Sequence, residues 1–203
     1  MPPKPAKTVA ESLTRTARGT QGYLDRLEQL HMAGALTQRD VTRAYEGAFL
    51  RYYTDLERHF ESLFMGLLMS RFVATGNSRS LVQIRSDQVA RQVLAGERNY
   101  VDWLPIQKTT DRAKTFLSRG KPFDRLSPAD KDALHRMHLV RNAVAHQSGH
   151  ALRKFRKHLV DREGLPPVQR TPAGYLRGQH APGQTRLSYF MAQGVQAMTR
   201  VCA

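Results

Sequence analysis

The chain has 203 residues, of which 40% are hydrophobic, and its formal net charge is +15 with a sequence pI of about 10.6. This length and composition allow one domain with a packed core, whereas a bilayer span is excluded because the longest apolar run falls far short of ~20 residues. A charge this positive favours nucleic acid or an anionic surface as partner, although a soluble protein with a basic surface would give the same value.

Residues 1–36 are expected to form a flexible N-terminus and a short helix. The first part is rich in Pro, Lys, Thr and Ala and lacks the apolar segment of a secretory signal. Leu24, Leu27 and Leu30 then recur at helical spacing and predict an amphipathic helix over residues 21–32. The single cysteine, Cys202, leaves no disulfide to form within the chain, and we expect a cytoplasmic protein.

Residues 37–162 carry the strongest periodic signal and are expected to form a helical bundle. Apolar side chains recur every three or four positions from Val41 to Phe72, which predicts one continuous helix with Thr37 and Asp40 at its start. The aromatic residues of this stripe could stack on nucleic-acid bases, but their helical spacing favours a place in the core.

Shorter elements follow. A helix over residues 86–94 has Ser86 as its cap, and a helix over residues 109–120 has Gly120 as its end. Trp103 lies between them and is expected to anchor the core rather than to bind a ligand.

A further helix begins at Ser127, Pro128 and Asp130, which supply a cap, a first-turn proline and a charge that favours the helix dipole. At about 100° per residue, one face of this helix is apolar and is expected to meet the core. Its members are Ala133, Met137, Val140 and Val144.

The opposite face of the same helix carries three imidazoles and one amide, which are expected to point away from the core. These residues are His135, His138, Asn142 and His146. Arg141 lies between the two faces, about 140° from His146 at the same spacing.

Three interpretations of this polar row compete. The first is an ordinary solvated face, although such faces usually carry Lys and Glu. The second is a metal site, since His146 and His150 have the i, i+4 spacing of zinc ligands, but Gly149 is expected to break the helix between them and no further ligand completes the set. The third is a nucleic-acid cleavage site, in which histidine moves a proton and arginine binds a phosphate.

The chain beyond this helix is strongly basic: from Arg141 to Ala203 it has ten Lys or Arg and two Asp or Glu. A helix over residues 150–161 carries four candidates for RNA binding, Arg153, Lys154, Arg156 and Lys157. Residues 163–203 are expected to form a Pro/Gly-rich loop followed by a final helix from residue 186 to about 200. In the loop, Tyr175 and Arg177 either contact RNA or help to wrap the bundle. The fold class is therefore predicted to be all-α.

The residues Arg141–His146, "RNAVAH", resemble the R-x4–6-H motif of the HEPN superfamily in its R-N-x-x-[AS]-H form. The context is also similar: a long amphipathic helix upstream, a capped helix that carries the motif, a glycine just after the histidine and a basic helix beyond. Over about residues 37–162 the chain looks most like the prokaryotic RiboL-PSP type of HEPN domain.

The resemblance implies an antiparallel helical bundle of HEPN type that forms a homodimer with the motif at its interface. It implies a metal-independent endoribonuclease without a cofactor, with Arg141 and His146 as the catalytic pair and Asn142 as their support. His138 and His150 are accessory candidates. Because one helix is not expected to aim both Arg141 and His146 at one phosphate, we expect two chains to supply them across a two-fold axis.

The chemistry implied is attack of a ribose 2′-hydroxyl on the adjacent phosphorus, with His146 as base or acid and Arg141 stabilising the charge. It leaves a 2′,3′-cyclic phosphate. The resemblance further suggests a toxin or phage-defence role with RNA as substrate and an antitoxin as regulator, away from any membrane. The alternative function is a non-catalytic HEPN module that binds RNA, a nucleotide or a partner protein.

Overall fold

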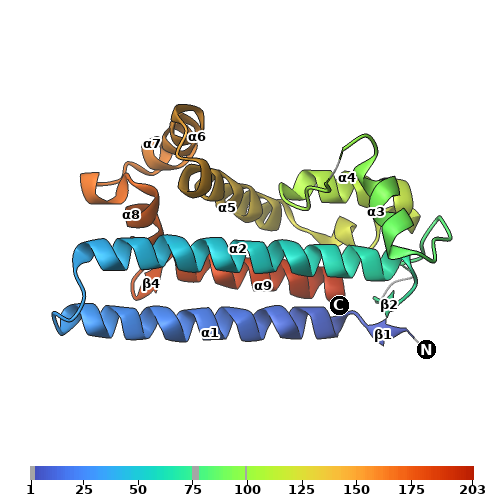
Figure 1. The fold of residues 1–203 in the computed structure, drawn as a ribbon, viewed down its shortest axis with the longest axis horizontal. Coiled ribbons are helices and arrows are strands. Elements are labelled where there is room, and N and C mark those ends of the chain that lie inside the picture. The colour runs from blue at the N-terminus through green and yellow to red at the C-terminus, as the bar shows by residue number, and fades with distance from the viewer. Residues whose placement is uncertain (1–2, 75–77, 99) are drawn as a thin grey trace. The chain divides into compact units, whose positions relative to one another are not determined.

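The computed structural model describes residues 3–74, 78–98 and 100–203, and most of them are helical (Figure 1). The long helices are α1 (Lys7–Met32), α2 (Gln38–Leu68), α5 (Pro128–His146) and α9 (Arg186–Cys202). The shorter helices are α3 (Asp87–Ala95), α4 (Ile106–Phe116), α6 (Gly149–Phe155), α7 (Asp161–Glu163) and α8 (Pro172–Arg177). The predicted all-α class is confirmed.

The strands are only two or three residues long. They are β1 (Lys4–Pro5), β2 (Phe72–Val73), β3 (Gln179–Ala181) and β4 (Gln184–Thr185). β1 pairs with β2 in parallel, and β3 pairs with β4 in antiparallel. Single turns of other helix types occur at Ser118–Gly120, Phe123–Arg125, Arg156–Val160 and Pro167–Gln169, of which the third is a π-helix.

The described residues form two compact units. Unit 1 draws them from the ranges Met1–Thr14, Leu56–His135 and Gly194–Ala203, and unit 2 from Arg15–Asp55 and Arg136–Gln193. Each of the helices α1, α2, α5 and α9 therefore contributes one segment to unit 1 and one to unit 2.

The core of unit 1 is aromatic. The ring centroid of Phe64 on α2 lies 5.3 Å from that of Trp103 and 5.5 Å from that of Phe123. Phe60, one turn earlier, packs against Phe123 at 6.5 Å. All four side chains are buried, so Trp103 anchors the core as predicted, and the stripe on α2 is a packing face.

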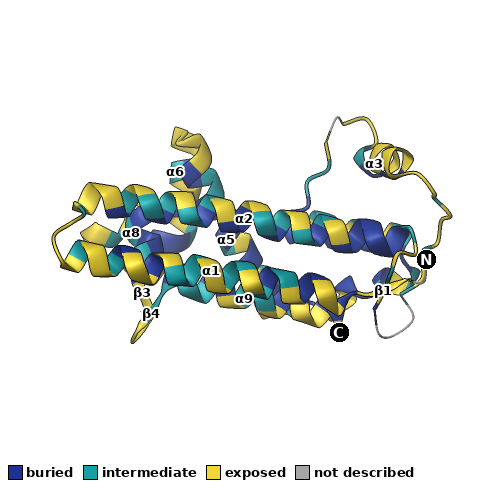
Figure 2. Cartoon of the chain, turned by 60° about the horizontal axis from the view of Figure 1, so that its bottom comes forward, coloured by how far each residue is buried: buried dark blue, intermediate teal, exposed yellow. Residues whose placement is uncertain are grey.

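In unit 2, the segments of α1 and α2 lie side by side and are joined by residues 33–37 (Figures 1 and 2). Buried and exposed residues alternate along both helices, as amphipathic helices require (Figure 2). Phe49 and Tyr52 of α2 are fully buried, and Phe49 packs on Phe190 of α9 with ring centroids 6.4 Å apart. Leu24 and Leu27 are buried as expected, whereas Leu30 is 49% exposed.

Helix α1 is longer than the helix expected over residues 21–32. It begins at Lys7, separated from the end of β1 by one residue, and has 26 residues. Its first turns bury Val9, Ala10 and Leu13, so the apolar stripe extends into a stretch whose Pro and Lys content suggests flexibility. The expected flexible start is therefore wrong from Lys7 onward.

Several helix boundaries follow the predicted signals. The Asp40 carboxylate accepts hydrogen bonds from the Thr37 backbone N–H and hydroxyl at 2.9 and 2.6 Å. Ser86 caps α3 by accepting from the N–H of Val89 at 3.5 Å, and α9 begins at Arg186 as expected. α2 ends at Leu68 rather than near Phe72, and α8 lies inside the stretch expected to be a loop. None of the helices in the described ranges is long and apolar enough to cross a membrane.

Candidate functional site

The helix that carries the motif, α5, starts with a reciprocal cap. The Asp130 carboxylate accepts from the backbone N–H and hydroxyl of Ser127 at 2.8 and 2.7 Å, and the Ser127 hydroxyl accepts from the N–H of Asp130 at 3.1 Å. Arg200 of α9 forms an ion pair with the same carboxylate at 3.1 Å, and Asp130 is only 1% exposed. The cap predicted from the sequence is present, and it fixes where α5 begins.

The apolar face of α5 is buried as predicted, with Met137 and Val140 fully inaccessible. The polar row departs from expectation. His135 and His146 are exposed, but His138 and Asn142 are half-buried. The ring of His138 packs near that of Tyr53 on α2, with ring centroids 6.5 Å apart. The middle of the row therefore meets the protein interior, and the expectation that it all points away from the core is wrong.

Hydrogen bonds connect three residues of the polar row, His138, Asn142 and His146, with Tyr53 and Arg141 into one hydrogen-bonded chain within unit 2. The hydroxyl of Tyr53 lies 3.0 Å from Nδ1 of His138, and Nε2 of His138 lies 2.9 Å from Nδ2 of Asn142. Oδ1 of Asn142 accepts from Nη1 of Arg141 at 3.0 Å. The same Nη1 lies 2.9 Å from Nε2 of His146, which is the exposed end of this series of hydrogen bonds.

The chemistry of the groups sets the direction of each bond. Arginine can only donate, so Asn142 turns its oxygen to Arg141 and its amide nitrogen to His138. Nε2 of His138 must then accept, which leaves the ring proton on Nδ1 to be donated to the Tyr53 hydroxyl. By the same argument Nε2 of His146 accepts from Arg141 and carries a lone pair. A basic nitrogen and a guanidinium thus meet at the surface.

Arg141 and His146 meet within one chain, which the helical projection did not anticipate, and the supply of the pair by two chains stays a prediction. Their Cα–Cβ bonds point about 140° apart around the helix axis, but this angle does not tell where the end of a long side chain lies. The arginine side chain is long enough to bend toward the helix end, and His146 is the last residue of α5. One chain therefore brings both groups within hydrogen-bond distance, with Asn142 holding the arginine in place.

The helix ends between His146 and His150, the two histidines considered as metal ligands. α5 ends at His146, Gln147 adopts a φ of 45°, and Ser148 caps α6 by accepting from the N–H of Ala151 at 3.2 Å. His150 therefore belongs to the first turn of another helix and is exposed. Among the described residues, no three His, Cys, Asp or Glu side chains come together as a metal site would require.

The basic residues after the motif are accessible. Arg153 and Lys154 on α6 are not buried, and Arg156 and Lys157 in the π-helical turn that follows are exposed. The intervening Phe155 is fully buried and holds this segment to the interior. The four cations are therefore available to a polyanion, while an apolar residue between them anchors the backbone.

Tyr175 and Arg177 have structural partners instead. Tyr175 is fully buried, and its hydroxyl accepts from Arg136 at 2.8 Å and donates to Glu163 at 2.9 Å. Burial raises the pKa of Tyr175 to about 12. Its ring also faces the guanidinium of Arg186 at 4.8 Å. The alternative that Tyr175 contacts RNA is therefore wrong.

Arg177 binds Glu28 of α1 through two nitrogens, each at 2.8 Å, and binds Gln38 of α2 at 2.7 Å. Burial raises the pKa of the Glu28 carboxyl, but the hydrogen bonds from Arg177 and Tyr45 and the positive charge of Arg177 together outweigh burial and lower this pKa below its usual value. The segment around Tyr175 and Arg177 thus wraps unit 2, the second of the two interpretations.

One member of the hydrogen-bond chain is absent from the candidates derived from the sequence. Tyr53 lies beside the apolar stripe of α2 and is only 2% exposed, yet its hydroxyl meets His138. The sequence signal that could have indicated Tyr53 was its residue type. A tyrosine next to a packing face can bury its ring, and its hydroxyl then needs a hydrogen-bond partner that phenylalanine would not.

Comparisons of the chain with protein-family models, with curated proteins and with solved structures gave no match.

Proposed function

We propose that this protein is a metal-independent endoribonuclease of HEPN type. The observation that carries the proposal is the contact between Nη1 of Arg141 and Nε2 of His146 at 2.9 Å, at the exposed end of a hydrogen-bonded chain. A base and a phosphate-binding cation are the two groups that cleavage through a 2′-hydroxyl needs, and both are supplied here by side chains. The order of the residues, Arg-Asn-x-x-Ala-His, is the second support.

The resting contact also indicates how RNA would start the reaction. A phosphate is a stronger acceptor for a guanidinium than a neutral imidazole, so Arg141 exchanges His146 for a non-bridging phosphate oxygen. This exchange frees the lone pair on Nε2 of His146. Asn142 remains bound to Arg141 through its oxygen and limits how far the guanidinium moves.

His146 then takes the proton of the ribose 2′-hydroxyl, and the 2′-oxygen attacks the adjacent phosphorus. The bond between phosphorus and the 5′-oxygen breaks, and the 5′-oxygen leaves with a proton from solvent. The products are a 2′,3′-cyclic phosphate and a 5′-hydroxyl. Proton transfer of this kind contributes about 10²–10⁴-fold to the rate, and Arg141 adds stabilisation of the charge on the phosphorane-like transition state.

RNA binding is attributed to the positive surface as a whole. The net charge of +15 favours any polyanion, and Arg153, Lys154, Arg156 and Lys157 extend the cationic surface beyond the motif helix. These contacts recognise phosphate rather than base, so they hold the strand without selecting its sequence.

The wider assignment rests on the family resemblance. We propose an antiparallel HEPN-type bundle that acts as a homodimer, with a toxin or phage-defence role and a regulatory antitoxin. Each chain carries its own Arg141 and His146 in contact, so each protomer of such a dimer has one complete pair.

The direct test is incubation of the purified full-length protein with mixed RNA in EDTA, followed by analysis of the new ends. The expected result is cleavage in chelator that leaves 2′,3′-cyclic phosphate and 5′-hydroxyl ends, with DNA of matching sequence uncut because it has no 2′-hydroxyl. Loss of cleavage in EDTA with recovery on adding Zn²⁺ or Mn²⁺ would contradict the proposal. Retention of RNA without any cleavage would favour the non-catalytic binding module.

A further inference from the structure

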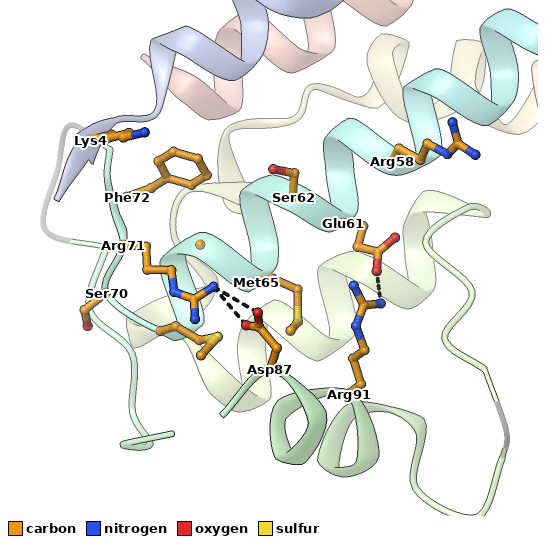
Figure 3. Close-up of a pocket in the computed structure, with 12 residues that line it drawn as sticks. Lys4, Arg58, Glu61, Ser62, Met65, Ser70, Arg71, Phe72, Asp87 and Arg91 are labelled. Carbon is orange, nitrogen blue, oxygen red and sulfur yellow. Dashed lines mark hydrogen bonds and ion pairs between the residues drawn. The ribbon is translucent and has the colours of Figure 1, made fainter. Parts of the chain in front are cut away.

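Unit 1 contains a pocket of about 840 Å³ that is separate in its residues from the candidate nuclease site of unit 2. It lies where the C-terminal end of α2 meets the strand β2, the residue Lys4 of β1 and the first turns of α3 (Figure 3). A volume of this size is in the range of about 300–1,000 Å³ that is typical of small-molecule sites.

The deeper part of the pocket is apolar. Met65 is buried, while Met69 and Phe72 are partly accessible. The Phe72 ring rests directly on the backbone of α2 at Gly66, where an added Cβ would lie only 1.9 Å from Cδ2 of Phe72. Glycine at this position therefore lets an aromatic ring form a wall of the pocket.

The rim of the pocket is cationic. Lys4, Arg58, Arg71 and Arg91 line it together with two acids, Glu61 and Asp87, for a net charge of +2. These basic side chains are on exposed residues, in contrast with the methionines below them.

Both acids of the rim are already neutralised by arginines. Arg71 contacts the two carboxylate oxygens of Asp87 at 2.9 and 3.2 Å, and Arg91 pairs with Glu61 (Figure 3). Lys4 has no ion pair with any residue in the described part of the chain. Its ammonium thus gives the rim a positive charge that no described carboxylate balances.

We propose that this pocket binds a small organic anion, a phosphate or carboxylate group joined to a compact apolar body. The apolar body would cover Met65, Met69 and Phe72, and the anionic group would reach the rim beside Lys4 and the hydroxyl of Ser62. An inorganic anion would leave the apolar residues of the pocket in contact with water, and a neutral apolar ligand would not use the attraction of the exposed Lys4 ammonium. The site therefore prefers a ligand with both parts.

Calorimetric titration of the full-length protein distinguishes these ligand types. The probes are phenyl phosphate, benzoate, inorganic phosphate and benzyl alcohol. We expect at least one of the two organic anions to bind with 1:1 stoichiometry and about tenfold more tightly than either inorganic phosphate or benzyl alcohol. The stronger of phenyl phosphate and benzoate identifies the preferred head group. The proposal would be overturned if neither organic anion binds, or if neither binds more tightly than both inorganic phosphate and benzyl alcohol.

A charge reversal with a matched control tests the rim. Lys4→Glu is expected to weaken binding of the preferred anion about tenfold, whereas Lys7→Glu, which alters another exposed lysine outside the pocket, changes it less than about twofold. Equal weakening by both variants would mean that only the general surface charge attracts the probe, and the site would be abandoned.

A second variant tests the pocket without altering charge. Ser62→Trp places a large side chain over the cavity from an exposed helix position, where circular dichroism can confirm an unchanged fold. We expect it to abolish calorimetric binding of the organic anion. Wild-type binding by a folded Ser62→Trp protein would show that the ligand does not occupy this pocket. None of these measurements depends on RNA cleavage.

Discussion

Asn142 sets the direction of hydrogen bonding between two histidines. Its oxygen accepts from Arg141 and its nitrogen donates to His138, so the proton of His138 is confined to Nδ1 and faces Tyr53. The buried Tyr53 on α2 is thereby linked to the exposed His146 at the end of α5 through His138, Asn142 and Arg141, and the donor and acceptor of each hydrogen bond between them are fixed. The order of this chain holds Arg141 beside His146.

Tyr53→Phe removes the acceptor for the Nδ1 proton of His138. The imidazole then favours the opposite tautomer, which turns a donor toward Asn142 and forces its amide to flip away from the arrangement that holds Arg141. We expect a decrease of about 1 kcal/mol in unfolding free energy and a fall of about fivefold or more in the rate of RNA cleavage at saturating RNA.

Tyr52→Phe is the matched control for this change. Tyr52 is a neighbouring buried tyrosine whose hydroxyl donates to the carbonyl of Met191 at 2.9 Å, outside the chain that reaches His146. Urea denaturation should show a similar decrease in stability in both variants, with cleavage at saturating RNA reduced only in Tyr53→Phe. An equal fall in cleavage in both would mean that Tyr53 acts through general stability alone.

Among the helices, the starts of α2 and α5 were predictable because each depends on a few neighbouring residues. The pairs Thr37 with Asp40 and Ser127 with Asp130 occur three positions apart at the expected helix starts, and in the structure both form reciprocal caps. The early turns of α1 were not predictable, because a polar sequence there is made helical by tertiary burial of Leu13 and its neighbours.

The contact between Arg141 and His146 was also not predictable from the sequence. A helical projection gives the direction of Cβ atoms but not the reach of a flexible side chain near a helix end. The role of the Tyr53 hydroxyl required knowing which helix packs on α5, and the apolar pattern of α2 does not specify that partner. The residues of the candidate site were therefore predictable from their motif, whereas their mutual contacts were not.

Ser127→Ala tests how far α5 depends on its cap. The variant removes the acceptor for the N–H of Asp130 and one donor to a carboxylate that is 1% exposed. We expect the unfolding free energy to fall by about 2 kcal/mol, measured by urea denaturation.

Ser86→Ala is the matched control for the cap. The hydrogen bond from the N–H of Val89 to the Ser86 hydroxyl is long, at 3.5 Å, so its removal should lower the unfolding free energy by about 0.5 kcal/mol or less. Equal decreases in Ser127→Ala and Ser86→Ala would show that the reciprocal cap adds nothing.

At the scale of the whole molecule, the positive charge and the proposed dimer have separate consequences. A net charge of +15 favours polyanions without depending on any one residue, so the proposed RNA affinity and the proposed cleavage should be separable by mutation. The proposed dimer raises the separate question of whether the proposed catalytic groups are shared between two chains. The contact between Arg141 and His146 within one chain predicts that they are not.

Mixing two inactive variants tests this point. In a heterodimer of Arg141→Ala and His146→Ala chains, each chain lacks one member of its own pair, so we expect no recovery of RNA cleavage after subunit exchange is verified by native mass spectrometry. If the pair instead forms across the two-fold axis, one site of each heterodimer is whole, and about a quarter of the wild-type activity returns after statistical exchange. Such recovery would contradict the contact within one chain.

The most direct test of the account is single-turnover RNA cleavage by His146→Ala, measured together with RNA affinity. We expect the rate to fall by about 10²–10⁴-fold, because the variant has no proton acceptor for the 2′-hydroxyl, while the dissociation constant changes less than about twofold. His135→Ala, which removes another exposed histidine of α5 outside the hydrogen-bonded chain, should keep the wild-type rate. Cleavage at the wild-type rate by His146→Ala would contradict the nuclease assignment.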